Sequence, residues 1–416
     1  MMKKVLSLSL AAMMAVSLTA CGGSETKDTA ADTSNETTAA ADAGTEEGES
    51  QETEAAADGE TFKIGAIGPI SGAAAVYGTA VQNGAQLAVD EINAAGGING
   101  YQISYSFEDD ENDSEKAVNA YNTLKDWGMQ MLVGTTTSTP CIEVAGQSSA
   151  DNIFQITPSG SAVECAAAPN VFRVCFSDPA QGMASAQYIG EHALATKVAI
   201  IYDSSSVYSS GIKEQFVTEA ANQNIEVVAE EAFTADNNTD FKTQLQKAKD
   251  SGAELVFLPI YYTEASLILS QAKSIDYAPL FFGCDGMDGI LQVENFDTSL
   301  AEGLMLLTPF AADATDDLTV NFVTTYEEKF GETPIQFAAD AYDAVYAIKA
   351  AAEDAGITPD MSASDICEAL KVSMTNIAIE GLTNVSGETM SWTAEGEPNK
   401  EPKAVVIENG AYKAME

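Results

Sequence analysis

The sequence predicts an α/β protein with two doubly wound lobes. Short apolar runs alternate with segments whose apolar residues recur every three to four positions, which indicates alternating strands and helices. Such alternation is typical of a parallel sheet with helices on both faces. It occurs in two series of similar size, before and after Asp178 and Pro179. Roughly 350 residues follow the polar N-terminal region, which is too many for one small core.

The first series of elements begins at residue 62. Its predicted strands are apolar runs, at 62–67, 103–107, 131–133 and 153–156. Its predicted helices are 78–95, 114–127 and 142–150. In the first of these helices Val81 and Ala85 share one face, and Gly96 follows as a C-terminal cap.

The second series has the same pattern of elements. Its predicted strands are 198–202, 225–229, 255–258 and 280–282, and its predicted helices are 181–195, 210–223, 241–250 and 264–275. A third block adds the strands 303–307 and 404–408 and the helices 320–330, 337–352 and 363–372. The last strand lies far along the chain from the strands that it is expected to join.

The first 21 residues have the order of a secretory signal that ends in a cysteine. Two lysines precede a short apolar run, and the tetrapeptide Leu-Thr-Ala-Cys stands at 18–21. The run is shorter than the roughly 20 apolar residues that span a bilayer. This order resembles the lipobox of bacterial lipoproteins, which implies a signal peptide at 1–20 and a lipid on Cys21. The alternative is an ordinary signal with an incidental cysteine.

Residues 21–60 are predicted to form a disordered acidic tether behind the acylated Cys21. From Gly22 to Glu60 the chain contains no Val, Ile, Leu, Phe, Tyr or Trp. Without large apolar side chains the segment cannot offset the entropy of ordering, and its carboxylates repel one another. We therefore expect the folded part to be held near a membrane but away from its surface.

Charge and cysteine usage exclude several function classes. The formal net charge of −44 would repel nucleic-acid phosphates. The six cysteines have no C-x-x-C spacing and His192 is the only histidine, so neither a metal site nor a Ser/His/Asp hydrolase is expected. No phosphate-binding glycine loop occurs, and no cofactor is predicted. A Cys165–Cys175 disulfide and free buried thiols remain equally open alternatives.

Five stretches resemble one family when taken in order. They are Ile-Gly-Ala-Ile-Gly-Pro-Ile-Ser-Gly at 64–72, Ala-Ala-Gly-Gly-Ile-Asn-Gly at 94–100, Val-Gly at 133–134 with Ser138, Ile-Thr-Pro-Ser-Gly-Ser at 156–161, and Phe-Ala-Ala-Asp-Ala-Tyr-Asp-Ala at 337–344. The chain resembles the extracellular solute-binding proteins of ABC transporters, in the branch of the leucine/isoleucine/valine-binding proteins. These are the type I periplasmic binding proteins.

The resemblance implies two Rossmann-like lobes that close on a ligand in the manner of a Venus flytrap. Three crossovers are expected to join the lobes, near 177–179, 308–311 and 388–393. Lobe 1 would then comprise 61–178 and 309–389, and lobe 2 would comprise 179–308 and 390–416.

The same resemblance implies the binding residues of the cleft. Ser138, Ser159 and Ser161 match positions that hold the carboxylate and ammonium of an amino acid, and Asp285 matches the acid that pairs with the ammonium. Helix N-termini beyond strand ends suit a carboxylate without a formal cation. Aromatic residues that match the side-chain pocket are Tyr77, Tyr208, Tyr261 and Phe337, with Tyr262 as an adjacent alternative to Tyr261. The alternative roles are capping and turn chemistry for the polar residues and core packing for the aromatics.

The expected function is capture of an amino acid, with a branched-chain or other apolar side chain favoured, for an ABC permease with its ATPase subunits. We expect a non-enzymatic monomer, lipid-anchored at the extracellular face of the cell membrane. Alternative ligands are an amide, urea or an aromatic acid, because the fold alone does not choose among them. A sensory module of the same fold is a further alternative.

Overall fold

The computed structural model describes residues 60–384 and 388–415. The predicted signal peptide, Cys21 and all of the predicted tether except Glu60 lie outside the described residues. The described residues form two main β-sheets and a small two-stranded one. Within these residues, no helix combines the length and apolar composition that crossing a membrane requires.

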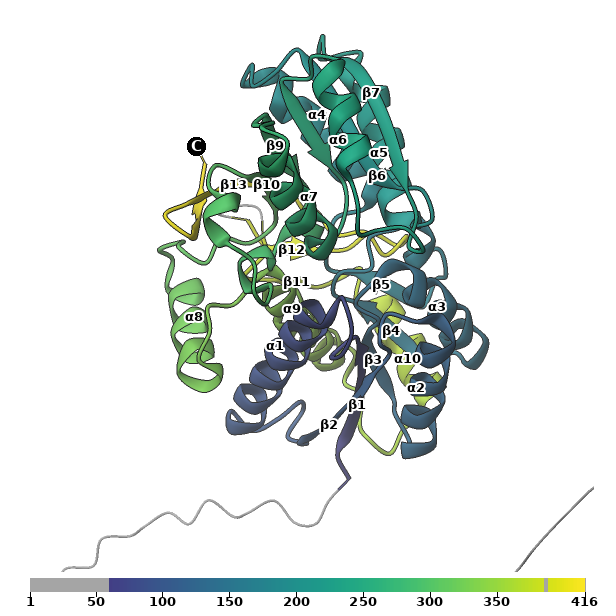
Figure 1. The fold of residues 1–416 in the computed structure, drawn as a ribbon. Coiled ribbons are helices and arrows are strands. Elements are labelled where there is room, and N and C mark those ends of the chain that lie inside the picture. Colours follow the sequence, from purple (N-terminus) through teal and green to yellow (C-terminus); the bar gives the residue numbers. More distant parts are fainter. Residues whose placement is uncertain (1–59, 385–387, 416) are drawn as a thin grey trace, which may run out of the picture. The chain divides into compact units, whose positions relative to one another are not determined.

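The first sheet has five parallel strands in the order β2-β1-β3-β4-β5 (Figure 1). The strands are β1 (Phe62–Gly68), β2 (Ile103–Asp109), β3 (Met131–Gly134), β4 (Phe154–Thr157) and β5 (Val171–Arg173). Because side chains alternate along a strand, Ile64 and Ile67 point to opposite faces. Ile64 joins the core under α1 (Ala75–Ala94) and α9 (Gln336–Ala355), and Ile67 joins the core under α2 (Ser114–Trp127) and α3 (Ser138–Asp151).

The second sheet has seven strands in the order β14-β13-β10-β9-β8-β6-β7. They are β6 (Lys197–Asp203), β7 (Glu226–Phe233), β8 (Leu255–Leu258), β9 (Leu280–Gly283), β10 (Met305–Thr308), β13 (Lys403–Glu408) and β14 (Ala411–Ala414). The first five are parallel, and β13 pairs antiparallel with both β10 and β14. Helices α4 (Asp178–Glu191) and α5 (Val207–Ala220) pack on one face, and α6 (Lys242–Asp250) and α7 (Tyr262–Ser274) pack on the other.

The chain crosses between the two main sheets three times. It leaves the first sheet after β5 and enters α4. After β10 it passes into α8 (Asp317–Phe330), α9 and α10 (Ala363–Ser373), of which α9 and α10 contact strands of the first sheet. It returns to β13 through the small sheet of β11 (Ala378–Ile379) and β12 (Met390–Ser391). The predicted α/β class with two doubly wound lobes is confirmed, and the exact lobe boundaries stay a prediction.

Several helices begin earlier than the sequence pattern predicts. Helix α3 begins at Ser138 instead of 142, and it includes Pro140 in its first turn. Proline is tolerated there because the first N–H groups of a helix have no intrahelical partner. The strands β5 and β14 were not predicted, since β5 has only three residues and β14 (Ala-Tyr-Lys-Ala) contains no β-branched residue.

The described cysteines are free thiols and form no disulfide. All five described cysteines are free and buried, so Cys165 and Cys175 form no disulfide. Cys165 instead shares a small buried cluster with Cys141. Burial raises the pKa of the Cys175 thiol.

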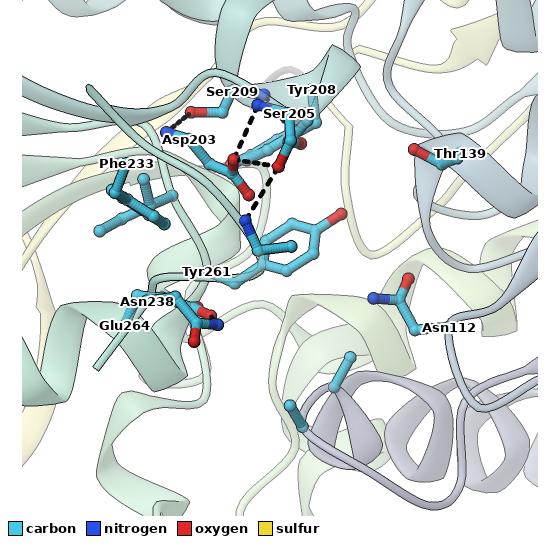
Figure 2. A pocket seen from close by; sticks show the side chains of 15 residues that line it. Asn112, Thr139, Asp203, Ser205, Tyr208, Ser209, Phe233, Asn238, Tyr261 and Glu264 are labelled. Carbon is cyan, nitrogen blue, oxygen red and sulfur yellow. Dashed lines mark hydrogen bonds between the residues drawn. The ribbon is translucent and has the colours of Figure 1, made fainter.

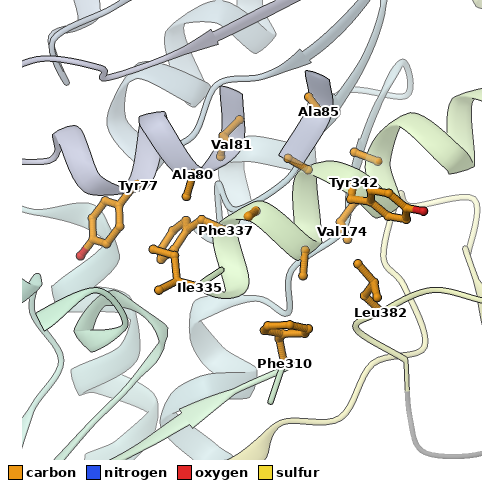
Figure 3. Packing of buried hydrophobic residues seen from close by; sticks show 14 of the residues in the cluster. Tyr77, Ala80, Val81, Ala85, Val174, Phe310, Ile335, Phe337, Tyr342 and Leu382 are labelled. Carbon is orange, nitrogen blue, oxygen red and sulfur yellow. The ribbon is translucent and has the colours of Figure 1, made fainter. Parts of the chain in front are cut away.

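Helices α1 and α9 pack closely, and this contact positions the N-terminal end of α1. A Cβ atom at Gly84 would lie 2.0 Å from the carbonyl oxygen of Ala338, so only glycine permits this approach. Figure 3 shows Ala80, Val81 and Ala85 of α1 on the side that faces α9. The ring of Tyr77 lies at the end of this row, near Phe337 (Figure 3).

We expect Gly84→Ala to lower the free energy of unfolding by about 1–3 kcal/mol, because the added methyl group overpacks the contact between α1 and α9. Urea unfolding of the full chain would measure this. The matched control is Gly146→Ala in α3, where an added Cβ meets no atom within 4 Å. That change should raise the free energy of unfolding by up to about 1 kcal/mol, because alanine has a higher helix propensity than glycine. Equal effects of the two substitutions would contradict the packing argument.

Candidate functional site

The site lies where the strand order of each main sheet reverses. In the first sheet β1 stands between β2 and β3, and in the second β6 stands between β7 and β8. At such a switch point neighbouring connections diverge to opposite faces, which leaves a crevice beyond the C-terminal ends of the strands. The segments that follow β1, β3, β4, β6, β8 and β9, together with the start of α9, supply the walls of one pocket.

This pocket contains seven of the eight residues that the sequence predicts for ligand binding. Its cavity volume is about 10 Å³. The lining residues are Tyr77, Thr136, Thr137, Ser138, Ser159, Tyr208, Tyr261, Asp285, Gly286 and Phe337. Thr136, Thr137 and Gly286 were not singled out from the sequence, although each adjoins a predicted residue or lies in the same loop as one.

The wall from the first sheet consists of two loops joined by hydroxyl groups. Ser159 Oγ donates a hydrogen bond to the Thr136 carbonyl oxygen at 2.6 Å. Ser138 Oγ accepts from the N–H groups of Ser161 at 3.2 Å and Ala162 at 3.1 Å. Thr137 is the N-cap of α3 and makes no side-chain capping bond. The first N–H groups of α3 are therefore not capped by this side chain, and such groups attract an anion.

Ser161 is the one predicted residue that does not line the pocket. It is buried behind the pocket wall, where its carbonyl oxygen accepts hydrogen bonds from Arg173 Nη1 at 2.6 Å and from the Asp178 N–H at 2.9 Å. Its own N–H donates to Ser138. In this structure Ser161 therefore supports Ser138 instead of facing the pocket.

Asp285 supplies a buried carboxylate from the second sheet, two residues after the end of β9. It is only 4% exposed, and Tyr208 Oη donates to its Oδ1 at 2.7 Å. Burial raises the pKa of Asp285 to about 7, although the hydrogen bond from Tyr208 opposes this rise. Two buried cations are engaged elsewhere, since Arg173 pairs with Glu397 at 3.1 Å and Lys400 pairs with Asp340 at 2.9 Å. In the part of the chain that the structure describes, Asp285 thus has donors but no cationic partner.

A second buried carboxylate, Asp178, does not line the pocket but lies within electrostatic reach of Asp285. Asp178 and Pro179 served only as a lobe boundary in the sequence. The structure buries Asp178 in the first turn of α4, and within the described residues its Oδ1 has no hydrogen-bond partner. Burial, and to a smaller degree the charge of Asp285, raise its pKa. Gln181 lies in the same turn of the helix and accepts from the Asp285 N–H at 3.3 Å.

Four aromatic side chains complete the pocket and bring the lobes together. The ring of Tyr77 stacks on Phe337 with 4.2 Å between ring centroids, and it meets Tyr261 edge-on at 5.3 Å. Tyr208 and Tyr261 are 5.1 Å apart. Tyr77 Oη donates to the Gly286 carbonyl oxygen at 2.5 Å, which joins α1 to the segment after β9. These rings make an apolar wall beside the polar groups.

A larger chamber adjoins the pocket and is shown in Figure 2. Its cavity volume is about 260 Å³, and Tyr208 and Tyr261 line both spaces. Asp203, Ser205 and Glu264 line it from the second lobe. Figure 2 shows Asn112 and Thr139 across the chamber from them.

Metal binding finds no support in the part of the chain that the structure describes. Those residues contain no group of three or more His, Cys, Asp or Glu side chains placed to hold a metal ion. His192 is exposed at the end of α4, where its ring stacks on Tyr188.

Three comparisons with known proteins agree with this architecture. The chain is 30% identical over 302 residues to the Leu/Ile/Val-binding protein homolog 3 of Brucella melitensis. The aligned region covers 72% of this chain and 81% of that protein. It is 28% identical over 314 residues to the leucine-, isoleucine-, valine-, threonine-, and alanine-binding protein of Pseudomonas aeruginosa. That alignment covers 75% of this chain and 82% of the relative.

Solved structures show the same two-lobed fold. The branched-chain amino acid transporter substrate binding protein LivJ from Streptococcus pneumoniae, in complex with isoleucine, superposes with a TM-score of 0.77 at 30% identity over 86% of this chain and 99% of that one. A solute binding protein from R. palustris in complex with benzoate has a TM-score of 0.75 over 85% of this chain and 95% of that one, and at 19% identity it shows the fold alone. Residues 61–402 match the family described as periplasmic binding protein. The chain therefore belongs to the periplasmic binding protein family.

Proposed function

We propose that this protein captures an α-amino acid between its lobes and delivers it to an ABC importer. The observation that carries the proposal is the buried carboxylate of Asp285, which has no cationic partner among the described residues and faces the same pocket as the start of α3. An α-amino acid carries one group for each, an ammonium for Asp285 and a carboxylate for the helix N-terminus.

The proposed binding mode assigns a role to each wall of the pocket. The ligand carboxylate meets Ser138, Ser159 and the first N–H groups of α3, with Ser161 supporting Ser138 from behind. The ammonium meets Asp285, and Asp178 adds negative charge close by. The aliphatic part of the ligand packs on the aromatic side chains, which are Tyr77, Tyr208, Tyr261 and Phe337. Contacts from both lobes then favour the closed arrangement as a shift of population.

The relatives support an amino acid over the other ligands. The two similar curated proteins are named for leucine, isoleucine and valine, and the pneumococcal structure contains isoleucine. A branched-chain amino acid is thus the first ligand to try. Benzoate, urea and simple amides lack an ammonium and would leave Asp285 unpaired, so they rank lower.

The proposal includes a place and a partner. The protein acts as a binding protein and not as an enzyme, at the extracellular face of the cell membrane. Cys21 carries the lipid anchor, and residues 22–60 tether the lobes to it. The partner is an ABC permease with its ATPase subunits, and the protein works as a monomer without a cofactor. The unusual acidity of the chain agrees with a soluble domain exposed to solvent.

Thermal melting against a ligand panel tests the proposed function. The protein is first unfolded and refolded to remove carried ligand, and then mixed with each amino acid, urea, acetamide and benzoate. A ligand at 100 times its dissociation constant should add about 2.7 kcal/mol and raise the melting temperature. We expect a rise with leucine, isoleucine or valine. A rise with benzoate or acetamide and with no amino acid would refute the amino-acid assignment.

Asp285→Asn should weaken amino-acid binding by about tenfold to a thousandfold, because the ammonium loses its charged partner while the side-chain shape is kept. Isothermal titration calorimetry measures the change. Asp276→Asn is the matched control, since it removes the same charge from an exposed position of the second lobe. Unchanged binding in Asp285→Asn would remove Asp285 from the site.

Binding should also depend on pH through Asp285. Its pKa in the free protein is about 7, and the ammonium of the ligand lowers that pKa in the complex. Below pH 7 the carboxyl must release its proton when the ligand binds, so affinity falls as pH falls. We expect affinity about tenfold weaker at pH 6 than at pH 8. Titrations in buffers of different ionisation heat should show proton release at pH 6 that Asp285→Asn abolishes.

A further inference from the structure

The chamber beside the pocket has a lining that an aliphatic side chain does not require. Two carboxylates, Asp203 and Glu264, line it together with Ser205, Asn238 and Asn112. None of the 15 residues that line the chamber is Lys, Arg or His. A ligand group that enters the chamber therefore meets acceptors and negative charge, with no cation to balance them.

Of these acceptors, Glu264 is the best placed to bind a cation. It stands in the first turn of α7, and its Oε1 accepts a hydrogen bond from Asn238 Nδ2 at 2.8 Å. Burial, and to a smaller degree the charge of Asp203, raise the pKa of Glu264. The Glu264 carboxylate is thus partly desolvated and close enough to Asp203 to be repelled by it. A cation between them would relieve both effects.

The chamber and the pocket share Tyr208 and Tyr261 as lining residues. Burial and then the charges of Asp178, Asp285 and Glu264 all raise the pKa of the Tyr261 hydroxyl. That hydroxyl therefore lies within electrostatic reach of the proposed ammonium site and of Glu264. Figure 2 shows the Tyr261 ring extending across the chamber, with Asn238 and Glu264 on one side and Asp203 and Ser205 on the other.

We propose that the chamber is a subsite for the positively charged end of a long side chain. The protein then binds amino acids that end in an ammonium or guanidinium group, with that group held by Glu264 and Asp203. This inference rests on the proposed function, because Asp285 and Ser138 must hold the α-ammonium and α-carboxylate. It also implies that a side chain ending in a carboxylate is rejected, since it would face two carboxylates without a cation.

Calorimetric titration of the refolded full chain with four amino acids tests the inference. Lysine and arginine carry the charge, norleucine has similar length without charge, and glutamate has the opposite charge. We expect lysine or arginine to bind at least about tenfold more tightly than norleucine, and glutamate to bind more weakly than all three. Leucine is included to test the proposed function itself.

Glu264→Gln should weaken the binding of lysine or arginine about tenfold and leave the affinity for leucine unchanged. Retained leucine binding also shows that the variant is folded. The matched control is Glu294→Gln, which changes an exposed glutamate of the same lobe and should alter neither affinity.

The outcomes separate the two proposals. If leucine binds and both lysine and arginine bind no better than norleucine, the charged subsite is overturned while the proposed function stands. If no amino acid binds at all, both proposals are overturned. Should Glu264→Gln fail to fold, the comparison of the four ligands on the unaltered protein decides the matter alone.

Discussion

The position of Tyr77 is the constraint on which the site depends. The contact between α1 and α9 requires glycine at position 84, and it leaves Tyr77 at the end of α1 that faces the second lobe. There the Tyr77 ring stacks on Phe337 and its hydroxyl donates to the Gly286 carbonyl oxygen. Because Gly286 follows Asp285 directly, this bond and the one that Gln336 Nε2 donates to the Asp285 carbonyl oxygen at 2.9 Å both hold the segment that carries the acid.

The electrostatics of the pocket are incomplete without a ligand. A buried carboxylate that lacks a cation is disfavoured in its charged form, which explains the raised pKa values of Asp285 and Asp178. The buried cations Arg173 and Lys400 instead hold backbone carbonyl groups, Glu397 and Asp340. A ligand that brings its own ammonium satisfies what the fold leaves unpaired.

The resemblance predicted most of the pocket because its motifs sit at fixed places in the fold. Ser138 and Ser159 follow strands of one parallel sheet, so their loops meet at the same edge. Ser161 was predicted on equal grounds, yet two residues beyond Ser159 the backbone has turned and its carbonyl oxygen is held by Arg173. In the sequence, Asp178 was read only as part of a lobe boundary. Whether such an acid is buried depends on what packs against it in the folded chain.

By itself the sequence determined the local architecture of this protein. Strand and helix periodicity is a property of neighbouring residues, and it therefore predicted two α/β series, most helices and the strands of four or more residues in them. The tertiary structure alone decided which residues from distant segments share a space. It kept Cys165 and Cys175 unpaired, placed Ser161 behind the pocket and added β14 to the sheet edge. It also set Asp203 and Glu264 around one chamber, because the lining of a cavity arises from the packing of elements and not from any one of them.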